Sequence, residues 1–460
     1  MKKYNLIIVL NLILRISLLF LIPISLFGDG LSRFIPRVFQ VLHGNFLGFE
    51  EPPLFFIIES FWGLFFKGAV LEFFWKLTPF LSFIGILFLL PRIYQILKVN
   101  DREKIIITSL LIFSVWSLLS GEAVMIEMIT ALLTLLLFII IENPKRNLLS
   151  CLLIIIVSVL LLYSKQTSYF ILAGFFLYTF FKKNKKEIIL TNTSLLLSFV
   201  LFSPWIIKNY ILSIPKLNPI NTSIFIPLSN FFGKGFLSNV LNATYATFHY
   251  FWFIPLPEQV NFSGIIAIFY KIYYLSFILC SILMTFLIIF GMIKFYKEYK
   301  KYLFLILPLF AFEFLWNFLC SWYNGSGRYS FVFFIFLCFF AAKFIESIKN
   351  DKVKKLLYLM IIILICFFII TAFATVFRMD KKTDQLKIIS ETIKENNLKA
   401  MTNEVFAHAV VEYYSDKPLG YNNITSPSDL NLTTGDMILS QKDYKLFLKN
   451  GTYYVLRIKN

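Results

Sequence analysis

The stretch that decides the fold is LIIVLNLILRISLLFLIPISLF at residues 6–27, followed directly by GDGLSR at residues 28–33. The first part is apolar over a length that lets a helix cross the hydrocarbon core, which needs about 20 residues. It is longer than the apolar core of a signal peptide, and no clear small-residue cleavage site follows it. We therefore interpret it as an uncleaved first membrane span, with the polar residues after it outside the hydrocarbon layer.

The composition extends this interpretation to the whole chain. Of its 460 residues, 58% are hydrophobic and 15% are charged, and the mean hydropathy is +0.75. A soluble domain cannot bury so large an apolar share, whereas a bundle of membrane helices can. We therefore predict an all-α polytopic membrane protein with about eleven spans. The apolar runs lie at about 6–27, 77–97, 105–120, 122–141, 148–164, 167–181, 188–207, 263–293, 302–320, 329–346 and 356–377.

The charges between the runs predict the topology. The formal net charge is +18, but the cations concentrate in every second short loop and not in a basic soluble segment, so a nucleic-acid partner is excluded. Cation-rich loops face the cytoplasm, which places the N-terminus inside and the C-terminus outside a plasma or inner membrane. The cations in this set of loops are Lys98, Arg102, Lys104, Lys145, Arg146, Lys182, Lys183, Lys185, Lys186, Lys294, Lys297, Lys300, Lys301, Lys343, Lys349, Lys352, Lys354 and Lys355.

Three outward segments are long, at about 28–76, 208–262 and 378–460. Residues 31–43 have a helical apolar stripe that would lie in the membrane interface. Residues 52–67 form a second apolar stretch that we predict to be juxtamembrane, because a span there would invert the charge alternation downstream. The division predicted is a transmembrane domain at 1–377 and a small extracytoplasmic α/β domain at 378–460.

Charged side chains collect at the outward ends of the spans and in the first outward loop, where burial makes them costly and therefore informative. Each also has an ordinary structural interpretation. Asp29 could cap the helix that follows, Glu122 could cap span four, and interfacial lysines often serve as membrane anchors. The three His and five Cys are scattered, so they predict neither a metal site nor a disulfide. All of the candidates but Glu313, which lies within the run at 302–320, have such a position. They are Asp29, Glu50, Glu51, Glu122, Glu127, Lys165, Lys208, Glu313 and Arg328.

Several short motifs resemble the GT-C membrane glycosyltransferases, most closely the branch of protein O-mannosyltransferases and the lipid A aminoarabinose transferase. The order and shared outward location of these motifs carry the resemblance over nearly the whole chain. Glu51 departs from the family pattern, which has Lys after the Glu that Glu50 matches. The motifs are Gly28-Asp29-Gly30-Leu31-Ser32-Arg33, Glu50-Glu51-Pro52-Pro53-Leu54, the acid Glu127, Ser164-Lys165-Gln166, Ser203-Pro204-Trp205-Ile206-Ile207-Lys208-Asn209-Tyr210 and Gly327-Arg328-Tyr329.

The resemblance implies transfer of a sugar from a polyprenyl-phosphate donor to a hydroxyl of a lipid, glycan or protein, with inversion, on the outward side. Asp29 would be the general base, and Glu50 would orient the acceptor or help to hold a metal. Cations would stabilise the leaving phosphate, a role that falls to Lys165, Lys208 and Arg328. The further substrate or metal contacts implied are Arg33, Glu51, Glu127 and Tyr329. A divalent cation such as Mg²⁺ or Mn²⁺ stays open as a cofactor.

A transporter or flippase of lipid-linked sugars is the alternative, since it would also use charges such as Glu313 within the membrane. Transporters often show internal repeats, which this sequence lacks. The long outward loop and the folded tail favour the enzyme. A non-catalytic scaffold or a polysaccharide ligase is a third alternative.

Overall fold

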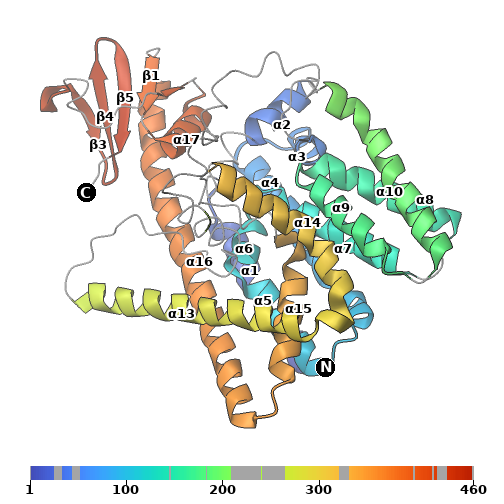
Figure 1. Cartoon of the computed structure of the whole chain (residues 1–460). Coiled ribbons are helices and arrows are strands. Elements are labelled where there is room, and N and C mark those ends of the chain that lie inside the picture. The colour runs from blue at the N-terminus through green and yellow to red at the C-terminus, as the bar shows by residue number, and fades with distance from the viewer. Residues whose placement is uncertain are drawn as a thin grey trace.

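The computed structural model describes residues 2–24, 34–43, 52–143, 147–182, 184–208, 240, 265–320, 331–396, 399–402, 404–416, 419–421 and 432–457. These residues form a helical bundle with a small sheet beside one end (Figure 1). The helices are α1 (Lys2–Leu21), α2 (Ile35–Leu42), α3 (Leu54–Gly63), α4 (Gly68–Leu97), α5 (Asp101–Phe113), α6 (Val115–Ser120), α7 (Glu127–Glu142), α8 (Leu148–Ser164), α9 (Ser168–Thr179), α10 (Lys185–Ile206), α13 (Ile265–Lys294), α14 (Tyr296–Cys320), α15 (Phe334–Glu346), α16 (Asp351–Lys394) and α17 (Val405–Ser415).

Each predicted apolar run overlaps a helix or a pair of helices. Within the described part of the chain, five helices are long and apolar enough to cross a membrane: α1, α4, α10, α13 and α16. Shorter apolar helices such as α8 and α9 lie among them. The number of crossings and the orientation of the N-terminus stay predictions, because length and composition alone do not place a membrane.

Two boundaries differ from the sequence prediction. Helix α4 begins at Gly68, so residues 68–76, predicted as loop, continue the helix outward. The predicted span at 122–141 begins only at Glu127, and the preceding turn is fully buried inside the bundle. Irregular backbone at this depth is tolerated where protein covers it. Glu122 is therefore not the cap of this helix, which was one interpretation of its position.

The first outward loop contains the two predicted helices. In α2 the predicted apolar stripe is buried at Phe34, Ile35, Val38 and Val41, and Pro36 lies in the first turn, where no backbone donor is needed. Helix α3 packs against α2, and the Phe34 ring contacts the rings of Phe55 and Phe56 at centroid distances of 5.7 and 5.9 Å. Both helices lie at the end of the bundle opposite the N-terminus (Figure 1).

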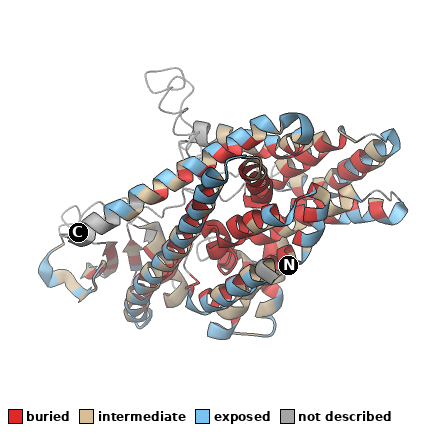
Figure 2. Ribbon diagram, turned by 90° about the horizontal axis from the view of Figure 1, so that it is seen from below, coloured by how far each residue is buried: buried red, intermediate tan, exposed pale blue. Residues whose placement is uncertain are grey.

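The helices are held by close packing between their backbones. Helix α9 packs tightly on α14 and α13 on α15. A Cβ added at Gly174 would lie 2.0 Å from the Leu305 carbonyl oxygen, and one at Gly291 would lie 2.2 Å from that of Phe340. Small residues allow such close approach, which is the usual means of helix association in membranes. Buried residues line the interior of the bundle, and exposed ones follow the outer faces of the helices at its edge (Figure 2).

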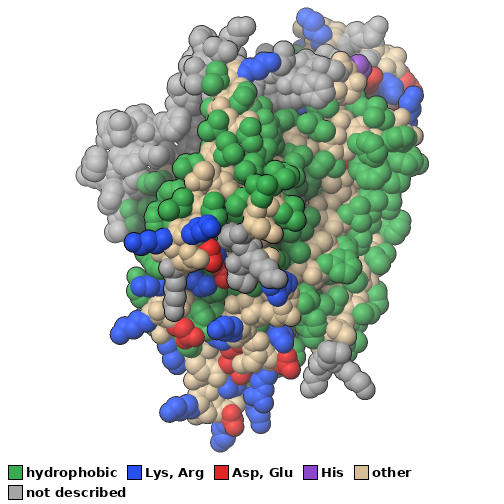
Figure 3. Space-filling model, turned by 90° about the vertical axis from the view of Figure 1, so that its right-hand side faces the viewer, with side chains coloured by type: hydrophobic (Ala, Val, Ile, Leu, Met, Phe, Trp, Pro, Cys, Tyr) green, Lys and Arg blue, Asp and Glu red, His purple; other side chains and the backbone are tan. Residues whose placement is uncertain are grey.

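The outer surface of the bundle is apolar where a membrane would surround it. Large hydrophobic side chains are exposed along α1, α10, α13 and α16, including Phe20 at 69%, Val200 at 62% and Ile293 at 68%. Figure 3 shows one face with a broad hydrophobic area, below which Lys, Arg, Asp and Glu gather at one end. Lipid contact explains an exposed apolar area of this extent. The chain is a multi-pass membrane protein.

A five-stranded sheet follows the bundle, with the order β2-β1-β5-β4-β3. Strand β1 is parallel to β2 and β5, while β4 is antiparallel to β5 and β3. This is a small α/β unit with α17, as the sequence predicted. The strands are β1 (Lys399–Thr402), β2 (Leu419–Tyr421), β3 (Met437–Ser440), β4 (Tyr444–Lys449) and β5 (Thr452–Arg457).

The sheet is joined to the bundle by one long helix. Helix α16 runs without a break through residues 377 and 378, where the sequence placed the domain boundary, and packs on α17 beyond it. Gln385 of α16 donates to the Asp443 carboxylate at 2.8 Å. The Tyr413 hydroxyl of α17 donates to the Glu72 carboxylate of α4 at 3.1 Å. Burial raises the pKa of Tyr413, so its hydroxyl stays a donor. These contacts fix the α/β unit at one end of the bundle.

Candidate active site

The best-defined group among the predicted site residues is an ion pair between two helix ends. Glu127 is the first residue of α7, where the helix dipole favours an acid, and Lys165 follows the last residue of α8 in extended backbone. The Lys165 Nζ and Glu127 Oε1 atoms are 2.6 Å apart, with side chains 14% and 3% exposed. One turn deeper, the hydroxyls of Thr130 and Ser164 are 3.1 Å apart. The two helix ends are therefore joined by two successive polar contacts.

The same end of the bundle contains Lys208. It follows α10, which packs closely along α8, and it is exposed. Near the end of α10 the Phe202 ring contacts Trp205 at 5.2 Å and Tyr163 of α8 at 4.7 Å. The motif that includes Pro204 and Trp205 thus packs α10 against the helix that ends at Lys165. Two predicted phosphate-binding cations consequently lie at one end of one helix pair.

The other predicted site residues lie outside the described part of the chain. The structure describes the helices that flank them: α2 and α3 follow the segments with the predicted base and the paired acids, and α15 begins shortly after the predicted Arg-Tyr motif. Their roles stay predictions. These residues are Asp29, Arg33, Glu50, Glu51, Arg328 and Tyr329.

Sequence reasoning missed a buried carboxyl group in the first outward loop. Glu59 of α3 is fully buried, and the Trp75 indole N–H donates to its backbone carbonyl at 3.1 Å. Burial raises the pKa of the Glu59 carboxyl well above its usual range. In the sequence Glu59 only interrupts an apolar stretch. A single carboxyl group among apolar residues is the signal that could have indicated its burial.

A second missed group is Arg15 in the first span. Its side chain is fully buried, and five hydrogen bonds use all the guanidinium donors. One of them reaches Glu122 Oε1 at 2.7 Å, and the carboxylate is also fully buried. The guanidinium carbon lies 3.5 Å from the centroid of the Phe83 ring. This pair holds the buried turn before α7 against α1, which is a structural role for Glu122.

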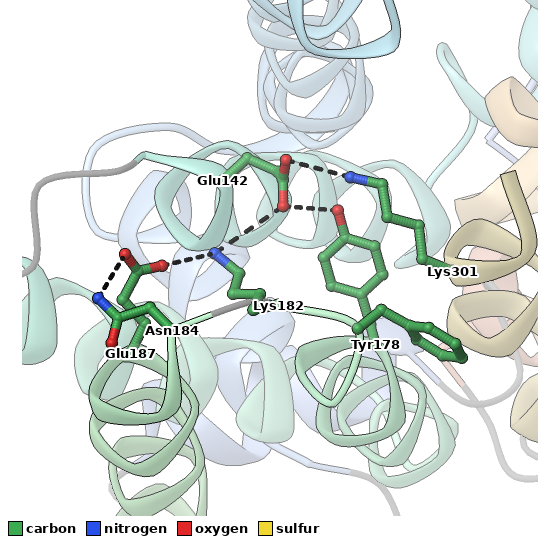
Figure 4. A pocket seen from close by; sticks show the side chains of 7 residues that line it. Glu142, Tyr178, Lys182, Asn184, Glu187 and Lys301 are labelled. Atoms are coloured by element: carbon green, nitrogen blue, oxygen red, sulfur yellow. Dashed lines mark hydrogen bonds and ion pairs between the residues drawn. The ribbon is translucent and has the colours of Figure 1, made fainter. Parts of the chain in front are cut away.

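A polar pocket of about 250 Å³ lies at the opposite end of α7. Its centre is Glu142, which accepts from the Tyr178 hydroxyl at 2.6 Å and pairs with Lys301 at 3.5 Å (Figure 4). Lys182 lies 3.9 Å from Glu142 and 3.8 Å from Glu187. The charges balance within the group, and they come from the ends of four helices or the turns beside them. We interpret the network as a structural one that holds these helix ends together.

The described residues give no support for a preformed metal site. Among them, no group of three His, Cys, Asp or Glu side chains comes together. The predicted acids Glu50 and Glu51 are not among the residues searched, so a divalent cation in the first outward loop stays an open prediction.

The comparisons with known proteins support the resemblance seen in the motifs. No protein-family model and no curated protein matches the chain. Among solved structures, ArnT from Cupriavidus metallidurans bound to undecaprenyl phosphate is 12% identical, with 91% of this chain and 86% of that chain covered at a TM-score of 0.54. ArnT in the apo state is 11% identical, with 91% and 85% covered at a TM-score of 0.52. Likeness at this identity establishes the fold, and the chain has the fold of the GT-C membrane glycosyltransferases.

For the sugar transfer that the motifs predict, replacing Lys165 by Gln is expected to lower turnover by about 10²- to 10³-fold, the range seen when one stabilising group for developing charge is removed. Initial rates of sugar release measure the effect. Because the substitution leaves the buried Glu127 carboxylate without its ion-pair partner, the double variant Lys165→Gln with Glu127→Gln is compared with it. A purely structural pair would recover activity in the double variant. Lys185→Gln, an exposed lysine at the start of α10, is the matched control.

Proposed function

We propose that this chain is a membrane glycosyltransferase that moves a sugar from a polyprenyl-phosphate donor to an acceptor hydroxyl on the extracytoplasmic side. The observation that carries the proposal is the Lys165–Glu127 pair, which holds a cation at one end of a bundle with the GT-C fold. That end also carries α2 and α3, the helices of the predicted catalytic loop. The likeness to an ArnT structure bound to undecaprenyl phosphate supports a lipid phosphate as the leaving group.

The proposed chemistry combines the described cations with the residues that the family resemblance predicts. The acceptor oxygen attacks the anomeric carbon as the bond from that carbon to the phosphate oxygen breaks. Asp29 accepts the hydroxyl proton, and the electron pair of the broken bond leaves with the polyprenyl phosphate. Lys165, Lys208 and Arg328 stabilise the charge that develops there, since fixed cations near a membrane are effective for this purpose. Attack from the face opposite the phosphate inverts the anomeric centre.

Glu127 has a supporting part in this proposal. Its carboxylate offsets part of the free energy that the desolvation of the Lys165 ammonium group costs, and it fixes the position of that group. A preorganised cation stabilises the leaving group without rearranging during the reaction. Nucleotide sugars stay in the cytoplasm, so a site on the outward side requires a lipid-carried donor, which agrees with the topology predicted from the loop charges.

The choice of donor tests this function. Purified protein is incubated with its membrane extract as acceptor source and with a panel of polyprenyl-phosphate hexoses and pentoses, or with the matching nucleotide sugars. We expect consumption of at least one lipid-linked donor and of no nucleotide sugar. Free polyprenyl phosphate and free nucleotide are measured in parallel. Nucleotide release without polyprenyl phosphate would contradict the proposal.

A transporter of lipid-linked sugars would use the same end of the helical bundle and the same cations, but it would not break the bond from the sugar to the phosphate. The fold favours the enzyme, because the solved structures that it resembles include the transferase ArnT. The α/β unit contacts α4 and α16, and on the predicted outward side it would offer a surface that an acceptor can contact.

A further inference from the structure

A large groove lies at the end of the bundle that contains the N-terminus, away from the candidate active site. It is bounded by the start of α1, the last turns of α4 and the start of α5, and its volume is about 1020 Å³. Ligand sites in proteins typically measure about 300–1,000 Å³, so the groove is at the upper end of that range. Its lining residues are Tyr4, Asn5, Pro91, Tyr94, Gln95, Lys98, Val99, Asp101, Lys104 and Ile105.

The inner wall of the groove is aromatic and apolar. Tyr94 is buried, and its hydroxyl is 2.7 Å from that of Thr108, which satisfies the polar atom. The Tyr4 ring meets the Tyr94 ring edge to face at a centroid distance of 6.4 Å. Val99 adds a buried aliphatic surface. Tyrosines are enriched where headgroups meet acyl chains, so this wall suits a lipid at the membrane interface.

The rim of the groove is basic. Lys98 is exposed and caps α4 in the left-handed conformation, with φ of 51°. Its backbone carbonyl accepts from Lys343 at 3.4 Å, which anchors this turn to α15. Lys104 pairs with the exposed Asp101 at 2.8 Å, a contact that solvent weakens. Two lysines and one aspartate therefore line the groove beside its apolar residues, which gives the rim a net positive charge.

The groove continues onto a lipid-facing surface. Along α1 the next residues on the outside of the bundle are apolar and strongly exposed, with Leu6 at 57%, Val9 at 50% and Leu10 at 53%. An occupant with a polar head at the lysines could thus extend apolar chains along α1. A soluble anion would use only the rim and leave the apolar wall in contact with water.

We propose that this groove binds an anionic phospholipid from the leaflet on the side of the N-terminus, with its phosphate at Lys98 and Lys104 and its acyl chains along α1. Basic pockets between membrane helices commonly bind acidic headgroups. The lipid fills the groove between α1, α4 and α5, and so fastens the first span to the other two helices. The proposal is independent of the transferase activity.

Native mass spectrometry of the detergent-purified chain tests it, with phosphatidylglycerol or phosphatidylcholine of identical acyl chains as the probe. We expect retention of phosphatidylglycerol in clear excess. In the double variant Lys98→Gln with Lys104→Gln, the affinity for phosphatidylglycerol should fall about 25-fold, since each lysine near a lipid surface contributes about fivefold. Equal retention of the two lipids by the wild-type chain would overturn the proposal.

Two further variants separate groove binding from general surface charge. Lys185→Gln with Lys186→Gln removes the same charge from exposed lysines at the start of α10, and it should keep the wild-type affinity. Asn5→Trp fills the groove without changing charge, and it should lower the affinity. The proposal would be contradicted if Lys185→Gln with Lys186→Gln lowered the affinity for phosphatidylglycerol as much as Lys98→Gln with Lys104→Gln. It would also be contradicted if Asn5→Trp left this affinity unchanged.

Discussion

Asp29→Asn is expected to lower sugar transfer by about 10²- to 10⁴-fold, the contribution typical of a general base. The amide is nearly the same size as the carboxylate but cannot accept the proton of the acceptor hydroxyl. Initial rates with the lipid-linked donor measure the effect, and Asp384→Asn in the exposed part of α16 is the matched control.

The same substitution separates catalysis from helix capping. The N-cap position of α2 is Phe34, so Asp29 does not cap this helix, and any other cap role of Asp29 lies outside the described residues. Asn, Ser and Asp are about equally good at an N-cap. A residue that only caps would tolerate Asn and Ser with full activity. If Asp29 is the base, Asp29→Asn and Asp29→Ser should both lose activity while the thermal unfolding midpoint of the protein stays unchanged. Activity at the wild-type level in Asp29→Asn would therefore remove the proposed base.

The second large effect concerns stability. Arg15→Met is expected to lower the free energy of unfolding by about 3–5 kcal/mol, because it leaves the Glu122 carboxylate buried without a partner. It also removes the donors to the backbone carbonyls of Ile112 and Ser117, which hold the break between α5 and α6. The midpoint of unfolding in detergent measures the change.

A pair of variants shows whether the charge or the packing matters. Arg15→Met with Glu122→Met replaces both charges by apolar groups and should recover much of the lost stability, since an apolar pair is often as stable as a buried ion pair. Asp384→Asn breaks an exposed pair with Lys387 and should leave the midpoint unchanged. An unchanged midpoint in Arg15→Met would show that the two side chains are not paired inside the folded protein.

The sequence predicted the helices well because hydrophobic length and loop charge are read directly from neighbouring residues. It predicted α2 from its stripe and the α/β unit from its change in polarity, and the structure contains both. It also placed Glu127 and Lys165 among the site residues without pairing them. Their contact joins residues 38 positions apart, and no local pattern carries such information.

The buried network around Arg15 was beyond sequence reasoning for the same reason. The sequence around an arginine in an apolar run does not show whether its side chain points to lipid, to a cavity or to a partner. The partner of Arg15, Glu122, is 107 positions away in the sequence. The broken start of α7 was also missed, because a buried turn has the apolar composition of a helix. The partners of such residues are set by packing between distant helices.

The most direct test of the proposed function asks whether the bond from sugar to phosphate breaks. Membrane vesicles from cells that produce the chain, washed free of nucleotide sugars, receive a polyprenyl-phosphate sugar labelled in the sugar, and vesicles with Asp29→Asn serve as the comparison. The proposed function predicts that label leaves the lipid donor as an equal amount of free polyprenyl phosphate appears, in the wild-type vesicles alone. Label that stays on the polyprenyl phosphate and only changes leaflet would contradict it and identify a transporter.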